Sequence, residues 1–87
     1  MDIDISADGR MLLQRPQQQW AGHHPGLLQT SRFAGQTLTA ALDNGDGFRL
    51  LYLGFQSGAF ATIDEAKQAA PAFARAVLAR LAALIED

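Results

Sequence analysis

The longest regular pattern of apolar residues lies in the last third of the chain, from Thr62 onward. At 100° per residue its apolar positions fall within an arc of about 140°, wide enough to cover a sheet. Thr62 and Glu65 have the spacing of a capping box, in which hydroxyl and carboxylate satisfy each other's backbone amides. The pattern predicts a helix over residues 62–86, kinked or divided at Pro71 because proline lacks an amide hydrogen. The arc comprises Ile63, Ala66, Ala70, Phe73, Ala74, Val77, Leu78, Leu81, Leu84 and Ile85.

Two runs of β-prone residues, 38–42 and 48–53, flank the sequence DNGDG and predict a β-hairpin. A loop with an odd number of residues keeps one face of both strands apolar, so we prefer that register. The opposed pairs are then Leu42 with Phe48, Ala40 with Leu50 and Leu38 with Tyr52. The other face carries Thr37, Thr39, Arg49, Leu51 and Leu53, which is more leucine than a solvated face requires.

The segments beside this hairpin extend the predicted sheet. Residues 27–33 favour a strand, although Pro25 and Gly35 equally frame a short helix. The sequence QSG at residues 56–58 is typical of a turn, and it predicts a brief strand at 59–61 that leads into the helix.

The chain is therefore expected to be one α+β domain. Residues 1–15 are predicted to form an N-terminal hairpin, and residues 16–26, which lack any period, a polar loop. Residues 27–61 complete an antiparallel β-meander of four or five strands, packed by the single long, proline-kinked helix 62–86. At 87 residues the chain is too short for a second core.

Composition agrees with a folded protein and limits its chemistry. Hydrophobic residues make up 48% of the chain and charged residues 18%, which is the balance of globular domains. The chain has no cysteine, so a disulfide framework and thiolate chemistry are excluded. The acidic start MDIDIS does not match a signal peptide, and no stretch is long enough to span a membrane. We expect a cytoplasmic protein.

Motifs for catalysis or metal binding fail on spacing. If Gly47 took the sixth position of a helix-loop-helix calcium site, the first and twelfth ligands would be Leu42 and Leu53, which are hydrocarbon. The serine of GFQSG stands one place late for a hydrolase nucleophile, and Ser57 is interpreted as a turn residue. The neighbours His23 and His24 point to opposite sides of an extended chain, which disfavours shared ligation of zinc. We expect no enzyme activity, catalytic residue, metal or cofactor.

Recognition residues are the remaining candidates. Residues 9–42 carry three arginines and no acid, although the formal net charge of the whole chain is -2. Trp20 either closes one end of the core or anchors a partner. The back of the helix presents a strip of small residues, Ala72, Ala76, Ala79 and Ala83, beside Arg75 and Arg80. The predicted partner-binding set is Trp20, Arg15, Arg32, Arg49, Leu51, Leu53, Arg75 and Ala79.

These observations favour a small non-enzymatic binding protein that contacts another protein, forms a homodimer, and acts as an accessory or inhibitor protein of the kind that phages and mobile elements encode. The alternative is single-stranded nucleic-acid binding through Arg10, Arg15, Arg32, Arg49 and Trp20. The order of elements resembles, at the level of the fold alone, the β-β-β-β-α single-strand nucleic-acid binders of the Whirly type. The resemblance implies bases stacked on sheet aromatics. No membrane contact is expected.

Overall fold

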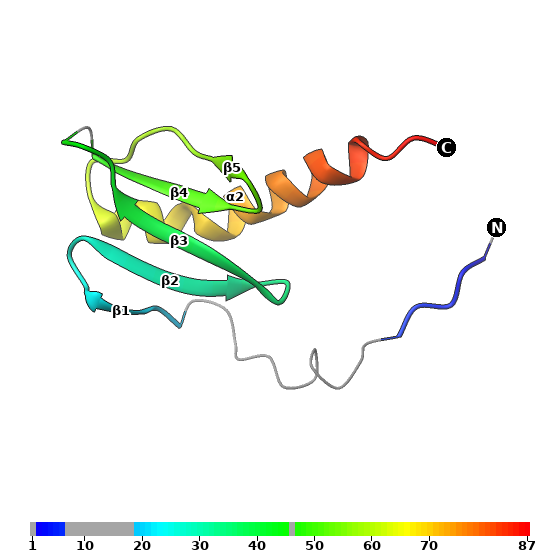
Figure 1. The fold of residues 1–87 in the computed structure, drawn as a ribbon, viewed down its shortest axis with the longest axis horizontal. Coiled ribbons are helices and arrows are strands. Elements are labelled where there is room, and N and C mark those ends of the chain that lie inside the picture. The colour runs from blue at the N-terminus through cyan, green and yellow to red at the C-terminus, as the bar shows by residue number, and fades with distance from the viewer. Residues whose placement is uncertain (1, 7–18, 46) are drawn as a thin grey trace.

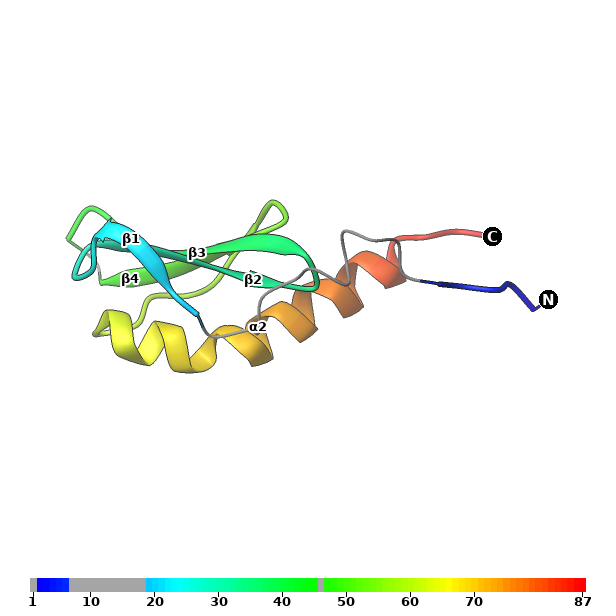
Figure 2. The same cartoon turned by 90° about the horizontal axis from the view of Figure 1, so that it is seen from below.

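Five strands follow one another along the chain and pair in that same order in one antiparallel sheet. The structure is a computed structural model that describes residues 2–6, 19–45 and 47–87. One C-terminal helix, α2, lies across one face of the sheet, so the molecule has two layers (Figures 1 and 2). The predicted α+β meander with a C-terminal helix is therefore confirmed. The elements are β1 (Ala21–His24), β2 (Leu28–Phe33), β3 (Gln36–Leu42), β4 (Phe48–Tyr52), β5 (Phe55–Gln56) and α2 (Ile63–Ala83).

The β3–β4 hairpin has the register that parity predicts. Its opposed pairs include Leu42 with Phe48, Ala40 with Leu50 and Leu38 with Tyr52. Because side chains alternate between the two faces of a strand, this register directs the apolar set of both strands toward α2. The strand interpretation of residues 27–33 is also confirmed, since β2 pairs with β3 along its whole length.

The core combines bulky residues of the sheet with small residues of the helix. Phe33, Leu38, Leu50 and Tyr52 are the largest fully buried side chains. The helix meets them mostly through alanines, which let its backbone approach the sheet closely while the sheet supplies the volume that fills the interior. The buried helix residues are Ala66, Ala70, Ala74 and Val77.

Tyr52, the only tyrosine of the chain, ties β4 to the end of β2. Its buried hydroxyl donates to the carbonyl oxygen of Phe33 at 2.6 Å. Burial raises the pKa of Tyr52 above its ordinary value of 10.0, because the phenolate is poorly solvated there. In the unfolded chain the phenol therefore ionises at lower pH than in the folded chain, so the folded state loses stability as pH rises past the ordinary value.

We expect the free energy of unfolding to fall between neutral pH and about pH 11, and Tyr52→Phe to flatten this fall. At neutral pH the variant should be less stable by about 1–2 kcal/mol, because the carbonyl of Phe33 loses its donor. Urea unfolding across this pH range measures both effects, and the absorbance of tyrosinate gives the pKa directly. Parallel pH profiles for the two proteins would contradict the assignment.

Helix α2 begins where the capping pattern predicts. Thr62 is its N-cap, and the amide of Glu65 donates to the Thr62 hydroxyl at 3.1 Å, an interaction worth about 1 kcal/mol. Pro71 lies inside one continuous helix, so the alternative of two abutting helices is wrong. Ala70 and Ala74, on either side of the proline, are both buried against the sheet, and this packing offsets the lost backbone hydrogen bond.

The helix ends earlier than predicted, at Ala83 instead of residue 86. Leu84 and Ile85 were assigned to the buried arc, but 65% and 77% of their surface is exposed. The physical reason is length: the last turns of α2 extend past the end of the sheet, so the periodic pattern continues where there is no sheet to cover (Figure 2). The amide of Leu84 turns back to the carbonyl of Leu81 at 3.1 Å and closes the helix.

Both edge strands differ from the predictions. The fifth strand is β5 at Phe55–Gln56, not residues 59–61, where Phe60 makes only an isolated bridge to Phe48. The chain reverses at Leu53 and Gly54, with φ values of 51° and 86°; leucine rarely adopts a positive φ, so residue 53 was counted as strand.

At the other edge β1 occupies part of the predicted polar loop 16–26, and all four of its residues are exposed. β1 is held in the sheet by backbone pairing with β2. Because such pairing needs no apolar side chains, the sequence of β1 has no apolar pattern from which the strand could be predicted.

The predicted N-terminal hairpin 1–15 falls largely outside the described residues. Its first half, residues 2–6, forms no strand. Its second half lies among residues 7–18, where the structure makes no statement.

Candidate functional site

The sheet face that points away from α2, here called the outer face, is open to solvent over the described residues (Figure 1). Alternation along β2, β3 and β4 places Thr30, Thr39 and Leu51 side by side in one row across it, with Gln56 of β5 next to Leu51. A second row contains Leu28, Ala41 and Arg49. Leu28 and Leu51 are 45% and 43% exposed, so two leucines lie in a surface that β2, β3 and β4 otherwise build from threonine, arginine and alanine.

Arg49, predicted to contact a partner, is engaged within the fold. Its Nε donates to the carboxylate of Asp43 and forms an ion pair with it. Its Nη1 donates to the carbonyl oxygen of Ser57 at 3.0 Å. Arg49 thus joins the β3–β4 turn to the segment after β5, and its charge is largely compensated.

Ser57 extends the pairing of β5 with β4. The amide of Leu50 donates to the Ser57 hydroxyl at 2.9 Å, and the amide of Ser57 donates to the Leu50 carbonyl at 2.9 Å. The Ser57 hydroxyl accepts the hydrogen bond that a backbone carbonyl would accept if the strand continued. Its role in the described structure is therefore structural, as its interpretation as a turn residue implied.

Trp20 packs on the core instead of extending into solvent. Its ring lies 6.4 Å from that of Phe33, and Nζ of Lys67 lies 5.7 Å from its centroid, within the range of a cation–π contact. Of the other predicted site residues, Leu53 lies in the β4–β5 turn, and Arg32 is exposed and donates to the Gly35 carbonyl at 3.1 Å. Arg15 lies outside the described residues.

The back of α2 presents the predicted strip of small residues. Ala72, Ala76, Ala79 and Ala83 are all exposed, as are Arg75 and Arg80. The strip and the outer face belong to different layers of the fold, so the structure does not bring the predicted partner-binding residues together into one site.

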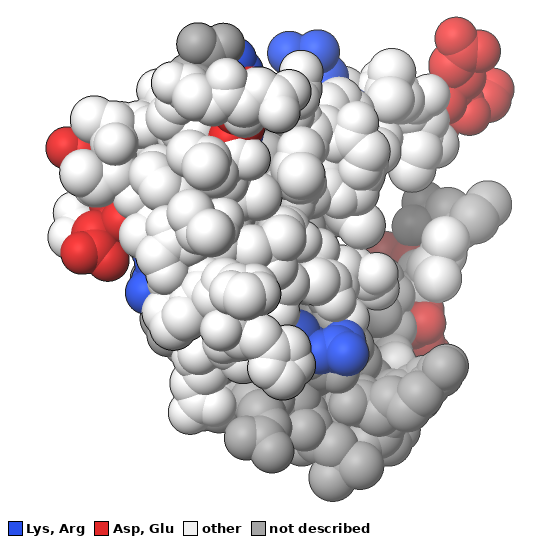
Figure 3. Space-filling view, turned by 60° about the vertical axis from the view of Figure 1, so that its left-hand side comes forward, with Lys and Arg blue, Asp and Glu red and all other residues white. Residues whose placement is uncertain are grey.

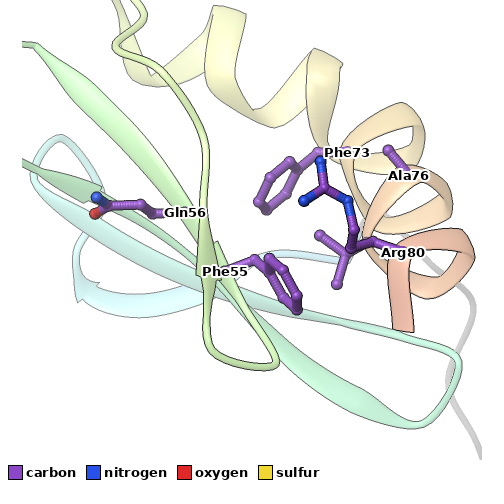
Figure 4. Close-up of a pocket in the computed structure, with 6 residues that line it drawn as sticks. Phe55, Gln56, Phe73, Ala76 and Arg80 are labelled. Carbon is purple, nitrogen blue, oxygen red and sulfur yellow. The ribbon is translucent and has the colours of Figure 1, made fainter. Parts of the chain in front are cut away.

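A hollow of about 310 Å³ lies between β5 and the C-terminal half of α2. We call it the β5–α2 hollow. Phe55 and Phe73 turn their rings toward the same space, the guanidinium of Arg80 lies beside them, and Gln56 points away (Figure 4). Sequence reasoning missed it because Phe55 belongs to a strand that was not predicted and Phe73 was assigned to the buried arc. Its lining residues are Phe55, Gln56, Phe73, Ala76, Val77 and Arg80.

Over the described residues, no group of three or more His, Asp or Glu side chains is placed to hold a metal ion. His23 and His24 are both exposed on β1. In the view of Figure 3 the surface is largely uncharged, and the Lys and Arg side chains lie apart without forming a continuous stripe. Among the helices of the described segments, none is long and apolar enough to cross a membrane.

Comparisons with protein-family models, curated proteins and solved structures each give no match. The functional argument therefore depends on the outer face and the β5–α2 hollow.

Proposed function

We propose that this chain is a non-enzymatic binding protein of the cytoplasm that forms a homodimer and docks on another protein, as an accessory or inhibitor protein would. The observation that carries the proposal is the outer face, where Leu28 at the start of β2 and Leu51 within β4 are nearly half exposed. An antiparallel sheet with one solvated face usually carries polar residues there. Contiguous exposed apolar patches with a polar rim are typical of surfaces that bind protein.

The chemistry of the outer face also describes its partner. Threonines flank the leucines, Arg32 lies at the margin, and the outward-facing positions of β2, β3 and β4 include no acidic residue. The face therefore suits a partner with a small apolar patch bordered by carboxylates. Because Arg49 is already paired with Asp43, the positive charge left for a partner is small.

Single-stranded nucleic-acid binding has less support among the described residues. Trp20, the expected stacking platform, packs against Phe33 and Lys67. Binding by this route predicts that an oligonucleotide quenches Trp20 fluorescence at low salt and that the affinity falls steeply as salt is added. If quenching with this salt dependence is observed, the nucleic-acid alternative replaces protein docking.

Leu51→Asp is expected to abolish capture of the protein partner from the native host without unfolding the chain, because a carboxylate in the middle of the outer face must be desolvated on docking. Leu27→Asp is the matched control, since Leu27 is 52% exposed but lies in the β1–β2 turn. Quantitative mass spectrometry of proteins captured by the three tagged chains checks this. The proposal fails if the three chains capture the same proteins in the same amounts.

A further inference from the structure

The end of α2 and the residues after it form an apolar segment without a partner in the described structure. Leu84 and Ile85 are 65% and 77% exposed, and Glu86 and Asp87 follow at once. Residues 84–87 thus present two large aliphatic side chains next to two carboxylates. We call them the acidic tail.

The β5–α2 hollow has the complementary chemistry. Phe55, Phe73 and Val77 supply apolar walls, and Arg80 supplies a cation at the margin. Arg80 is exposed, so a carboxylate can reach its guanidinium. An aliphatic side chain in the hollow would cover the phenylalanine rings, and a carboxylate beside it would pair with the guanidinium.

A tail cannot easily enter the hollow of its own chain. Leu84 keeps a right-handed helical conformation, with φ −81° and ψ −10°, so the tail leaves in the direction of the helix axis, away from the hollow. The hollow residues of α2 lie between four and eleven positions before the tail, about 6–17 Å back along the axis at the rise of an α-helix. A second helix that runs antiparallel to the first brings its own tail back over that distance.

The helix surface beside the hollow permits such an approach. Ala76, Arg80 and Ala83 have the i, i+4, i+7 spacing of one helix face, and both alanines are exposed. Small side chains let two helix backbones come close together. A twofold axis near the end of α2 would then make the contact reciprocal, as in most homodimers.

We propose that the acidic tail of a second copy of this chain occupies the β5–α2 hollow, with Leu84 or Ile85 against Phe55 and Phe73 and with Glu86 or Asp87 paired with Arg80. The exchange is reciprocal and builds the homodimer. This inference rests on the self-association in the proposed function and specifies where it takes place. It leaves the outer face free, so one dimer presents two docking surfaces.

Charge reversal tests the ionic half of the contact. Sedimentation equilibrium of the full chain is expected to show a dimer that Arg80→Glu weakens at least about tenfold. Glu86→Arg combined with Asp87→Arg should weaken it similarly, and joining all three changes should restore association to within about threefold of the original. Arg75→Glu is the matched control, since Arg75 is an exposed arginine of α2 outside the hollow, and it should leave the dimer unchanged.

Cross-linking tests which chain supplies the tail. Because the chain has no cysteine, Ala76→Cys, an exposed position that lines the hollow, and Ile85→Cys can be placed in separate chains and mixed. A disulfide between the two different chains is expected under mild oxidation. Absence of this product in a dimeric mixture would overturn the proposal.

Failure of this inference is distinguishable from failure of the proposed function. A dimer insensitive to all the charge reversals overturns the tail exchange and leaves self-association standing. A strict monomer at high concentration overturns both the tail exchange and the homodimer. Whether the chain docks on another protein is then still decided by the capture experiment with Leu51→Asp. A monomer that Arg80→Glu destabilises would show that Arg80 acts within its own chain, and this too overturns the proposal.

Discussion

Leu50→Ala is expected to destabilise the protein by about 3 kcal/mol, whereas Leu51→Ala should cost less than about 1 kcal/mol. Leu50 is fully buried opposite Ala40 and faces α2, so truncating it removes apolar contacts and leaves a cavity in the core. Leu51, the next residue, is 43% exposed on the outer face. Urea unfolding followed by Trp20 fluorescence measures both variants, because Trp20 packs on the core residue Phe33.

Comparing the variants of Leu50 and Leu51 tests the register of β4 as well as the burial of the two side chains. A shift of one residue would exchange the two faces of β4 and reverse the order of the two effects. Equal losses for Leu50→Ala and Leu51→Ala would mean that the outer face is covered, and the docking argument for the free chain would then fail.

The central hairpin and the start of α2 could be predicted because their determinants are close in sequence. The pairing of Leu50 with Ala40 follows from parity across one turn, and the Thr62 cap depends on a residue three positions later. Both patterns are complete within a short window. Neither the hairpin nor the start of the helix required knowledge of residues distant in the sequence.

The edge strands were missed because backbone pairing holds them without any apolar period. β1 is exposed at all four positions, and β5 has two residues that follow a turn with a positive φ at Leu53. The end of α2 was overestimated for the opposite reason. Its apolar period continues through Leu84, but whether a sheet lies opposite those residues depends on the length of the strands and cannot be read from the helix itself.

The candidate sites divide in the same way, into features that follow from a local sequence pattern and features that combine residues distant in the sequence. Leu51 on the outer face follows from strand parity, and the alanine strip of α2 follows from helical spacing. The β5–α2 hollow combines Phe55 of an unpredicted strand with Phe73 and Arg80 of the helix, so no local pattern contains it. The pairing of Arg49 with Asp43 and Ser57 was likewise hidden, because it joins one strand to the turn before it and the segment after the next strand.

Gly47→Ala is expected to destabilise the protein by about 3 kcal/mol or more, and Gly45→Ala by about 1–2 kcal/mol. Both glycines have a positive φ in the β3–β4 turn, of 95° and 87°, so both variants carry the strain of a left-handed backbone. They differ in the space around them. A Cβ at Gly47 would lie 2.4 Å from the carbonyl oxygen of Phe60, whereas a Cβ at Gly45 would meet nothing within 4 Å.

The carbonyl of Phe60 cannot move away from such a Cβ without disturbing the bridge between the sheet and the segment that leads to α2. The amides of Phe48 and Phe60 each donate to the other residue's carbonyl, at 2.8 and 2.7 Å, and this pair is the isolated bridge after β5. Gly47→Ala should therefore lose amide protection at Phe48 and Phe60 in hydrogen exchange, and Gly45→Ala should keep it. If the two variants lose the same stability and the same protection, close approach of the backbone is not what requires glycine at position 47, and its positive φ alone accounts for it.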